Sequence, residues 1–315
     1  MLNIKNILFP TDLSECAERA FQHAAFLANW HDANLHVLNV VGRHMYDYAS
    51  MRENFPVSDA ELADMLKTEG DGQQGTMPAP DALKINQMQL ERASASEAIL
   101  QFVDEKDIDL VVMGTHGRRG ANRLLIGSVA EEVVRSASCP VLTIRADEKV
   151  APGEAVRRIL VPVDFSDVSH RAIQHAKELA MTYGARLDLL HVVEEIALPA
   201  AYGMEPVNLV IPEVVENSER ALADMAREEI GYEHIVVHAL TGYAVSTILD
   251  FADENDIDLM VIATHGRTGI DRVLMGSVAE KVVRRAPCPV FTVKSFGKSL
   301  VPSAEKVAST DQESS

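Results

Sequence analysis

A loop built from glycine, histidine and arginine residues occurs twice in the chain, and these residue types suit the binding of phosphate groups. The first copy, GTHGRRGANRLLIGS, covers residues 114–128, and the second, ATHGRTGIDRVLMGS, covers 263–277. Glycines let a ligand approach the backbone amides closely, and a helix that starts after the loop offers unpaired N–H groups and a positive dipole end. The pattern therefore predicts a phosphate cradle, with simple glycine turns as the alternative.

The spacing differs from the common nucleotide loops. Gly114-x-x-Gly117 is followed by nine residues and then Gly127-Ser128, so neither G-x-x-x-x-G-K-[ST] nor G-x-G-x-x-G is present. Neither copy contains a lysine, the side chain that neutralises phosphate charge during phosphoryl transfer. The arginines of the first copy can shield phosphate or form a solvated face. They are Arg118, Arg119 and Arg123.

The serine that ends each loop has two interpretations. Ser128 and Ser277 stand where a phosphate would meet a helix N-terminus. Each is also followed three residues later by a glutamate, Glu131 or Glu280, which is the spacing of a capping box. Under the second interpretation the hydroxyl only caps its own helix.

Two aspartates follow the first apolar run of each repeat, in FPTDLS and VPVDFS. Asp12 and Asp164 can accept a hydrogen bond from a base or a ribose, or they can be turn residues beside the helix N-caps Ser14 and Ser166.

Histidines and cysteines add no convincing catalytic group. His116 and His265 lie inside the loops without an identifiable carboxylate partner, so a structural hydrogen bond is the favoured role. Cys16, Cys139 and Cys288 are far apart, which argues against disulfides or zinc and fits a cytoplasmic protein. The latter two precede a strand and are expected to be buried. No catalytic residue and no metal ligand is assigned.

The whole chain is a duplication. Residues 114–144 and 263–293 agree at 20 of 31 positions, far above chance. We therefore expect one domain at 1–146 and a second at 157–296, joined by a linker at 147–156 and followed by a flexible tail at 297–315.

Short β-branched runs alternate with helical patterns in each half. The runs indicate parallel strands covered on both faces: 6–10, 35–41, 110–114 and 141–144, then 158–163, 187–193, 259–263 and 290–293, with weaker runs at 83–90 and 235–240. The helical patterns cover 14–30, 96–108 and 128–137. Each half is predicted to be a five-stranded α/β domain.

Strand order decides where a ligand would bind. If the order is 3-2-1-4-5, the chain reverses between the first and fourth strands, and ligands of such sheets bind at that point, outside the carboxyl ends. Residues 10–12 and 114–127 would then meet at one crevice, although about 100 residues separate them in the sequence.

Composition excludes several classes of function. The formal net charge is −18, which disfavours general binding to nucleic acid. No apolar run is long enough to span a membrane. We expect no nucleic-acid partner and no membrane insertion.

Taken together, these motifs resemble the universal stress protein family in its tandem form. The resemblance covers both halves and rests on FPTDLS and VPVDFS, LNVV and LHVV, G-x-x-G-x9-G-[ST], and CPVLTI and CPVFTV. It implies two Rossmann-like domains of the adenine nucleotide alpha hydrolase-like kind, which bind ATP in one branch of the family, with Mg2+ left open. It also implies pairing through the fifth strands, here within one chain.

The resemblance carries a nucleotide site over by position. In the first half the residues are Pro10, Thr11, Asp12, Val40, Gly114, Gly117, Arg118, Gly127 and Ser128. In the second half they are Pro162, Val163, Asp164, Val192, Ala263, Gly266, Arg267, Gly276 and Ser277. Because Ala263 replaces the first glycine, we expect Ala263→Gly to tighten binding at the second site and Gly114→Ala to weaken it at the first.

Three functions remain open at this point. The favoured one is an ATP-binding regulatory protein of the stress response, acting on an unknown partner protein and forming a homodimer of tandem chains. The others are an interaction module that binds no nucleotide and a slow ATPase that uses Asp12.

Overall fold

The computed structural model describes residues 2–42, 55–66, 82–115, 126–145, 156–194, 196–198, 207–209, 212–265 and 275–301. The first half contains β1 (Asn6–Thr11), α1 (Glu15–Trp30), β2 (Asn34–Gly42), α3 (Asp59–Met65), β3 (Lys84–Arg92), α4 (Ala95–Glu105), β4 (Leu110–Gly114), α5 (Ser128–Ser136) and β5 (Val141–Ile144). The strands lie within two residues of the predicted runs.

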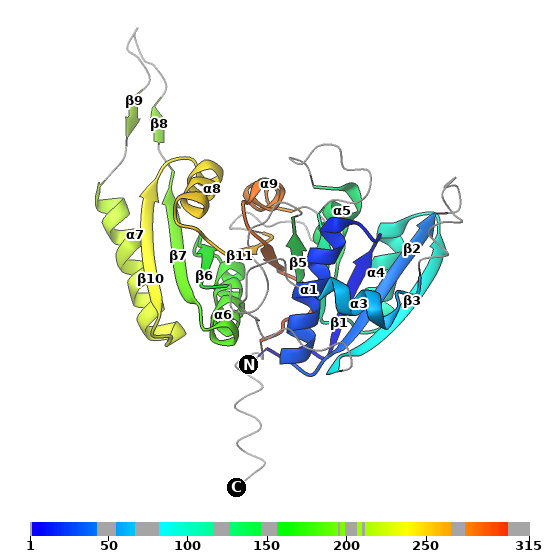
Figure 1. Ribbon diagram of the computed structural model, residues 1–315. Coiled ribbons are helices and arrows are strands. Elements are labelled where there is room, and N and C mark those ends of the chain that lie inside the picture. Colours follow the sequence, from blue (N-terminus) through cyan, green and yellow to red (C-terminus); the bar gives the residue numbers. More distant parts are fainter. Residues whose placement is uncertain are drawn as a thin grey trace.

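The second half repeats this order with additions. It contains β6 (Arg158–Pro162), α6 (Asp167–Tyr183), β7 (Arg186–Val193), β8 (Ile196–Leu198), β9 (Val207–Leu209), α7 (Pro212–Met225), a π-helical turn (Ala226–Ile230), β10 (Ile235–Thr241), α8 (Ala244–Glu254), β11 (Leu259–Ala263), α9 (Ser277–Arg285) and β12 (Val290–Val293). The hairpin β8–β9, which projects beyond the sheet in Figure 1, was not predicted.

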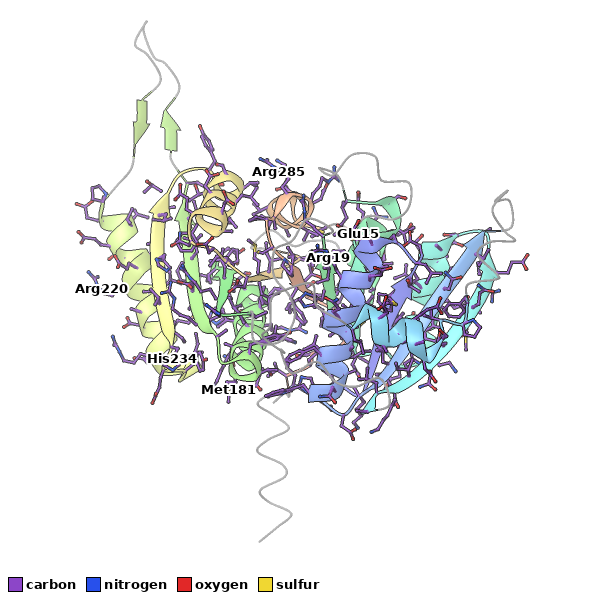
Figure 2. The ribbon with its side chains drawn as sticks, in the orientation of Figure 1. Glu15, Arg19, Met181, Arg220, His234 and Arg285 are labelled. Atoms are coloured by element: carbon purple, nitrogen blue, oxygen red, sulfur yellow. The ribbon has the colours of Figure 1, made fainter. Side chains whose placement is uncertain are left out.

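The strand order confirms the predicted topology. One ten-stranded sheet runs β10-β7-β6-β11-β12-β5-β4-β1-β2-β3, so each half has the order 3-2-1-4-5 with parallel neighbours. Helices cover both faces, and two apolar clusters, one formed with α1 and α6 and the other with α5 and α9, each extend through both halves. Exposed side chains such as Met181 and Arg220 project away from this core (Figure 2).

The two halves join through their fifth strands, as the resemblance implied. β5 and β12 pair antiparallel, with Phe291 opposite Leu142. Thr143 Oγ1 donates to the carbonyl of Val290 at 3.2 Å, and Thr292 Oγ1 donates to that of Val141 at 3.0 Å. The pairing gives each of these strands a neighbour on both sides, which removes an edge open to aggregation.

A buried lysine lies at this junction. Lys294, 1% exposed, donates from Nζ to the carbonyl of Val134 in the other half at 2.5 Å and lies 5.5 Å from the ring centre of Phe296. Burial lowers the pKa of Lys294 to about 7, because the charged form loses its hydration.

We expect stability to rise with pH because of Lys294. Between pH 7 and about pH 8.5 the folded chain has released a proton that the unfolded chain, with a lysine pKa of about 10.4, still binds, so the free energy of unfolding increases by up to about 1.4 kcal/mol per pH unit. At higher pH the buried thiol of Cys139, whose pKa is raised, opposes this increase. Lys294→Met should remove the slope in urea unfolding between pH 7 and 8.

Lys298→Met is the matched control. Burial lowers the pKa of Lys298, but hydrogen bonds to Asp107 and Asp109 outweigh it and raise the pKa above its usual value. Lys298 is therefore charged in both states over this pH range, and its replacement should leave the slope intact. An unchanged slope in Lys294→Met would contradict the prediction.

Residues 295–301, the C-terminal strap, pack against the first half. Gly297 has φ +76°, and a Cβ there would lie 2.1 Å from the carbonyl oxygen of Ser138, so only glycine fits. The amide of Lys298 donates to the same oxygen at 2.7 Å, and its Nζ lies 2.9 Å from Asp109 Oδ1. The expected tail at 297–315 thus begins with five packed residues; 302–315 lie outside the described residues.

The strap also connects the beginning of the first half to a helix of the second. Asn3 donates its amide to the carbonyl of Leu300 at 2.8 Å, and Leu300 donates its own amide to His175 Nε2 on α6 at 3.1 Å. Leu300 is 1% exposed. Burial lowers the pKa of His175 to about 4, so its Nε2 remains an acceptor at neutral pH.

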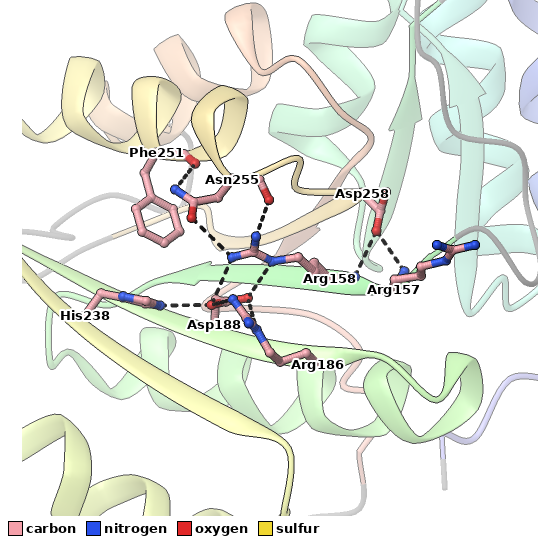
Figure 3. A network of polar contacts seen from close by, with 8 residues as sticks. All are labelled: Arg157, Arg158, Arg186, Asp188, His238, Phe251, Asn255 and Asp258. Carbon is pink, nitrogen blue, oxygen red and sulfur yellow. Dashed lines mark hydrogen bonds and ion pairs between the residues drawn. The ribbon is translucent and has the colours of Figure 1, made fainter.

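A charged network lies inside the second half, at the amino ends of its strands (Figure 3). The fully buried carboxylate of Asp188 on β7 accepts hydrogen bonds from Arg186 Nη2 at 2.8 Å, Arg158 Nε at 3.3 Å and His238 Nε2 at 2.9 Å. Arg158 also donates to the carbonyl of Asn255. Sequence reasoning missed this network, because Asp188 lies within a run taken as apolar.

Candidate functional site

The turn after the first strand holds an aspartate in both halves. Asp12 Oδ1 accepts the amide of Ser14 at 3.2 Å, and Asp164 Oδ1 accepts the amide of Ser166 at 3.0 Å. Both serines cap the following helix, as predicted. The turn interpretation of the two aspartates is therefore confirmed, and contact with a ligand stays a prediction.

Both turns also contain a strained residue. Leu13 has φ +61° and Phe165 has φ +60°, a region that costs a side chain with a Cβ roughly 1–2 kcal/mol. Such strain persists only where the surroundings fix it, and it gathers at functional sites. Its presence at the same place in both halves indicates that the direction of this turn matters.

A hydrogen bond ties the tips of the first two strands together. Asn39 Nδ2 donates to the carbonyl of Thr11 at 2.9 Å, and His191 Nδ1 donates to that of Val163 at 2.7 Å. The two residues directly precede the expected contact residues Val40 and Val192 in the sequence. Asn39 and His191 stand at equivalent positions of the repeated motifs LNVV and LHVV. This equivalence could have identified them from the sequence, but sequence reasoning did not use it.

The first loop glycine is required by its own fold. A Cβ at Gly114 would lie 2.8 Å from Cys16 Sγ and 3.2 Å from the Cys16 carbonyl oxygen, and φ lies outside the left-handed region. Cys16 is the second residue of α1, and its Sγ lies 3.3 Å from the carbonyl of Ile144. At the equivalent place the second half has Val168 with Ala263. Space for Cys16 therefore explains the glycine independently of any ligand.

We expect Gly114→Ala to destabilise the first half by about 1–3 kcal/mol, because the added methyl overpacks the start of α1. Cys16→Ala in the same chain should recover part of this loss, since it removes the closest atom. Urea unfolding of the two single variants and the double variant measures the coupling. Additive effects would show that the methyl meets something other than Cys16.

The loop ends in an open helix N-terminus in each half, and the capping-box interpretation of the two serines is wrong. The N-caps are Gly127 and Gly276, neither with a side-chain cap, and Ser128 and Ser277 are the first helical residues. The carbonyl of Gly127 accepts the amide of Glu131 at 2.9 Å. The serine hydroxyls are thus not used as caps, because the helix begins one residue earlier than the capping box requires.

The glycine N-cap also allows close backbone contact. The amide of Gly127 donates to the carbonyl of Thr115 at 2.6 Å, and a Cβ at Gly127 would lie 3.0 Å from that oxygen. Gly276 donates in the same way to Thr264 at 2.7 Å. These bonds close the two ends of each loop onto each other.

A pocket of about 380 Å³ lies at the carboxyl ends of the second-half strands. It brings together seven of the predicted site residues: Pro162, Val163, Asp164, Val192, Ala263, Gly276 and Ser277. Its apolar wall includes Leu190, Ile248 and Ile262. The residues come from four separate segments, so the predicted convergence at the strand tips is present here. The volume is within the range of small-molecule sites.

The first half has the same backbone arrangement. Pro10 and Thr11 end β1, Val40 lies in β2, and Gly114 ends β4 beside β1. The remaining site residues Gly117, Arg118, Gly266 and Arg267, with His116, Arg119 and Arg123, lie outside the described residues.

His265 occupies the wall of the pocket in a structural role. It is 7% exposed, and its Nδ1 lies 3.0 Å from Thr264 Oγ1 and 3.3 Å from Ser295 Oγ. These contacts support the structural hydrogen bond expected from the sequence. The thiols are buried as expected, and burial raises the pKa of Cys139 to about 12.

The described residues contain neither a membrane-spanning helix nor a cluster of metal-binding side chains. No helix among them is long and apolar enough to cross a membrane. Within the same part of the chain, no three or more histidine, cysteine, aspartate or glutamate side chains form a group that could hold a metal ion.

The topology defines a tandem Rossmann-like α/β protein, with a crevice at the carboxyl ends of the second-half strands. Residues 3–145 and 155–294 both match the model of the Universal stress protein family, so the chain belongs to this family and carries two copies of its domain.

The individual proteins that this chain is similar to are universal stress proteins as well. A universal stress protein of Methanocaldococcus jannaschii is 36% identical over 141 residues, 44% of this chain and 82% of that protein. One of Mycolicibacterium smegmatis is 24% identical over 298 residues, 91% of this chain and 96% of that protein. The structure of one from Archaeoglobus fulgidus has a TM-score of 0.64 at 22% identity and covers 92% of this chain and 98% of its own. A universal stress protein solved in complex with cAMP is 26% identical over 44% of this chain and 95% of its own, with a TM-score of 0.33.

Proposed function

We propose that this universal stress protein binds ATP in the crevice of each half and that occupancy regulates its contacts with a partner protein. The observation that carries the proposal is the second-half pocket, where residues assigned by the family resemblance converge from separate segments. A cytoplasmic location and a homodimer of tandem chains belong to the same proposal.

The pocket divides into surfaces that suit the parts of a nucleotide. Leu190, Val192, Ile248 and Ile262 offer an apolar wall for the base. The carboxylate of Asp164 suits a ribose hydroxyl, because an ionised carboxylate only accepts hydrogen bonds.

The phosphates would meet the start of α9. Residues 277–279 line the pocket, and the first amide bonded within the helix is that of Glu280, which donates to Gly276 at 2.9 Å. The three preceding amides are therefore available to an anion, and the helix dipole favours negative charge there. Gly266 and Arg267 would complete this side, with Gly117 and Arg118 in the first half. Mg2+, if it accompanies the nucleotide, would be held mainly by the phosphates.

Mass spectrometry of small molecules released from the purified, denatured protein tests the proposal first. Calorimetric titration should then give two ATP sites per chain, and a thermal-unfolding series should show stabilisation. At 100 times the dissociation constant one bound ligand adds about 2.7 kcal/mol.

The competing functions give different results. An interaction module without nucleotide shows equal stability with and without ATP, and this would overturn the proposal. A slow ATPase converts ATP to ADP at a rate that Asp12→Ala abolishes while binding persists.

A further inference from the structure

A second pocket lies at the opposite, amino end of the second-half strands. Arg157 directly precedes β6, Arg186 begins β7 and His234 directly precedes β10, and these three strands are neighbours in the sheet. The amide of Arg186 donates to the carbonyl of Arg157, and that of Leu187 to the carbonyl of His234, both at 2.8 Å. Figure 2 shows His234 at the end of this half away from the hairpin that follows β7.

The pocket has a volume of about 450 Å³ and a lining of mixed polar and apolar character. Its walls are formed by Arg157, Gly184, Arg186, Glu233, His234, Ile235 and Val236. Two arginines, a histidine and a glutamate therefore line one cavity. Arginine forks bind carboxylates and phosphates through paired hydrogen bonds.

The guanidinium of Arg186 is fixed by the carboxylate of Asp188. Its Nε and Nη2 donate to the buried carboxylate of Asp188 at 3.1 and 2.8 Å (Figure 3). Nη1 has no hydrogen-bond partner among the described residues. The side chain is 41% exposed, so part of it reaches solvent.

Arg157 is the second cation of the pocket. Its amide donates to Asp258 at 2.8 Å, which fixes its backbone. Its guanidinium is exposed and has no hydrogen-bond partner within the described part of the chain, although Asp258 attracts it electrostatically. It can therefore turn to an anion without breaking a hydrogen bond in the fold.

The local charge favours anions relative to the rest of the molecule. Three arginines, Arg157, Arg158 and Arg186, balance the carboxylates of this region, Asp188, Glu233 and Asp258. The chain as a whole carries a net charge of −18. The net charge of the chain repels an anion at long range, whereas the charges named at this edge balance.

The first half lacks this arrangement. Lys5 and Asn34 stand in place of Arg157 and Arg186, and His36 stands in place of Asp188. There Asn34 Nδ2 donates to Asn6 Oδ1 at 3.1 Å, and Lys84, which lies opposite Asn34 in the sheet, pairs with Asp32 at 2.7 Å. The two arginines that line the pocket are thus a property of the second half and not of the repeated fold.

From these contacts we propose that the amino-end pocket binds a small-molecule oxyanion between Arg157 and Arg186, next to His234. The group recognised is a phosphate or a carboxylate. The site is separate from the crevice at the carboxyl ends and does not depend on nucleotide binding there.

Proton NMR of the histidine side chains tests the proposal on the full chain. The His234 resonance is assigned by its loss in His234→Gln. Inorganic phosphate and succinate are titrated separately at constant ionic strength and pH. We expect a saturating shift of this resonance with phosphate, succinate or both, and the stronger of the two identifies the source of the oxyanion.

Variants separate the site from its neighbours. Arg157→Gln should raise the dissociation constant about tenfold, because a charge-assisted hydrogen bond is lost. Lys5→Gln, the matched change in the first half, and Ser277→Glu in the other crevice should leave it within about twofold. The proposal is overturned if neither anion gives a saturating shift, or if Arg157→Gln binds as the wild type does.

Discussion

Replacement of Asp188 by asparagine should lower the free energy of unfolding of the second half by about 3 kcal/mol. The carboxylate is fully buried and is the shared partner of Arg158 and Arg186, so its loss leaves two cations without their counter-ion. We place the effect at the lower end of the range for broken buried pairs, because the Arg186 side chain is 41% exposed and keeps part of its hydration.

Urea unfolding compares this variant with Asp224→Asn. Asp224 also pairs with an arginine, Arg227, at 3.4 Å, but its side chain is 53% exposed. Exposed pairs contribute little, so this control should change stability by less than about 0.5 kcal/mol. Equal effects at the two positions would show that the network does not hold the strands together.

The stabilisation that the Asp188 carboxylate provides should decrease at low pH. Burial raises the pKa of Asp188, but hydrogen bonds from His238, Arg186 and Arg158 outweigh it, and the pKa lies well below its usual value. An unfolded aspartate has a pKa of about 3.9, so the stabilisation is complete above about pH 5 and is lost as pH falls further. The difference between wild type and Asp188→Asn should be constant from pH 5 to 7 and smaller at pH 3.

The second large effect concerns the helix N-termini. Ser128→Glu together with Ser277→Glu should strongly weaken ATP binding at both sites, because each places a carboxylate where the proposed phosphates approach. Like charges in contact cost several kcal/mol, so we expect each dissociation constant to rise on the order of 100-fold.

The same substitutions should not harm the fold. A glutamate in the first helical turn is favoured by the helix dipole by about 0.3–1 kcal/mol. Calorimetry should show one remaining site in each single variant and none in the double variant, with thermal unfolding unchanged or slightly raised. Gln at both positions is the neutral control of equal size. Retention of ATP binding by the double glutamate variant would place the phosphates elsewhere.

Much of the fold was readable from the sequence because its signals are local. Runs such as 110–114 and 259–263 are apolar at nearly every position, since both faces of a parallel sheet are buried, and the structure begins and ends these strands at the predicted residues. The turn at Asp12 and the caps at Ser14 and Ser166 follow from short-range hydrogen bonding.

The features that were missed depend on distant residues. Gly114 is favoured because a larger residue would contact Cys16, which lies on another element. The C-terminal strap packs through contacts of its backbone with Ser138 and of Leu300 with Asn3, and no local sequence pattern indicates them. The capping boxes failed because sequence spacing alone cannot place a helix start to within one residue.

The bond between Asn3 and Leu300 has a consequence for biosynthesis. Domains of a nascent chain fold as they emerge, the N-terminal one first. The first half can therefore form its own sheet early. At that stage β5 has not yet paired with β12, and the hydrogen bond between Asn3 and Leu300 has not yet formed. Until the last of these residues leaves the ribosome, the first half exposes an open strand edge. This interval is when a chaperone or another nascent copy would compete for the strand.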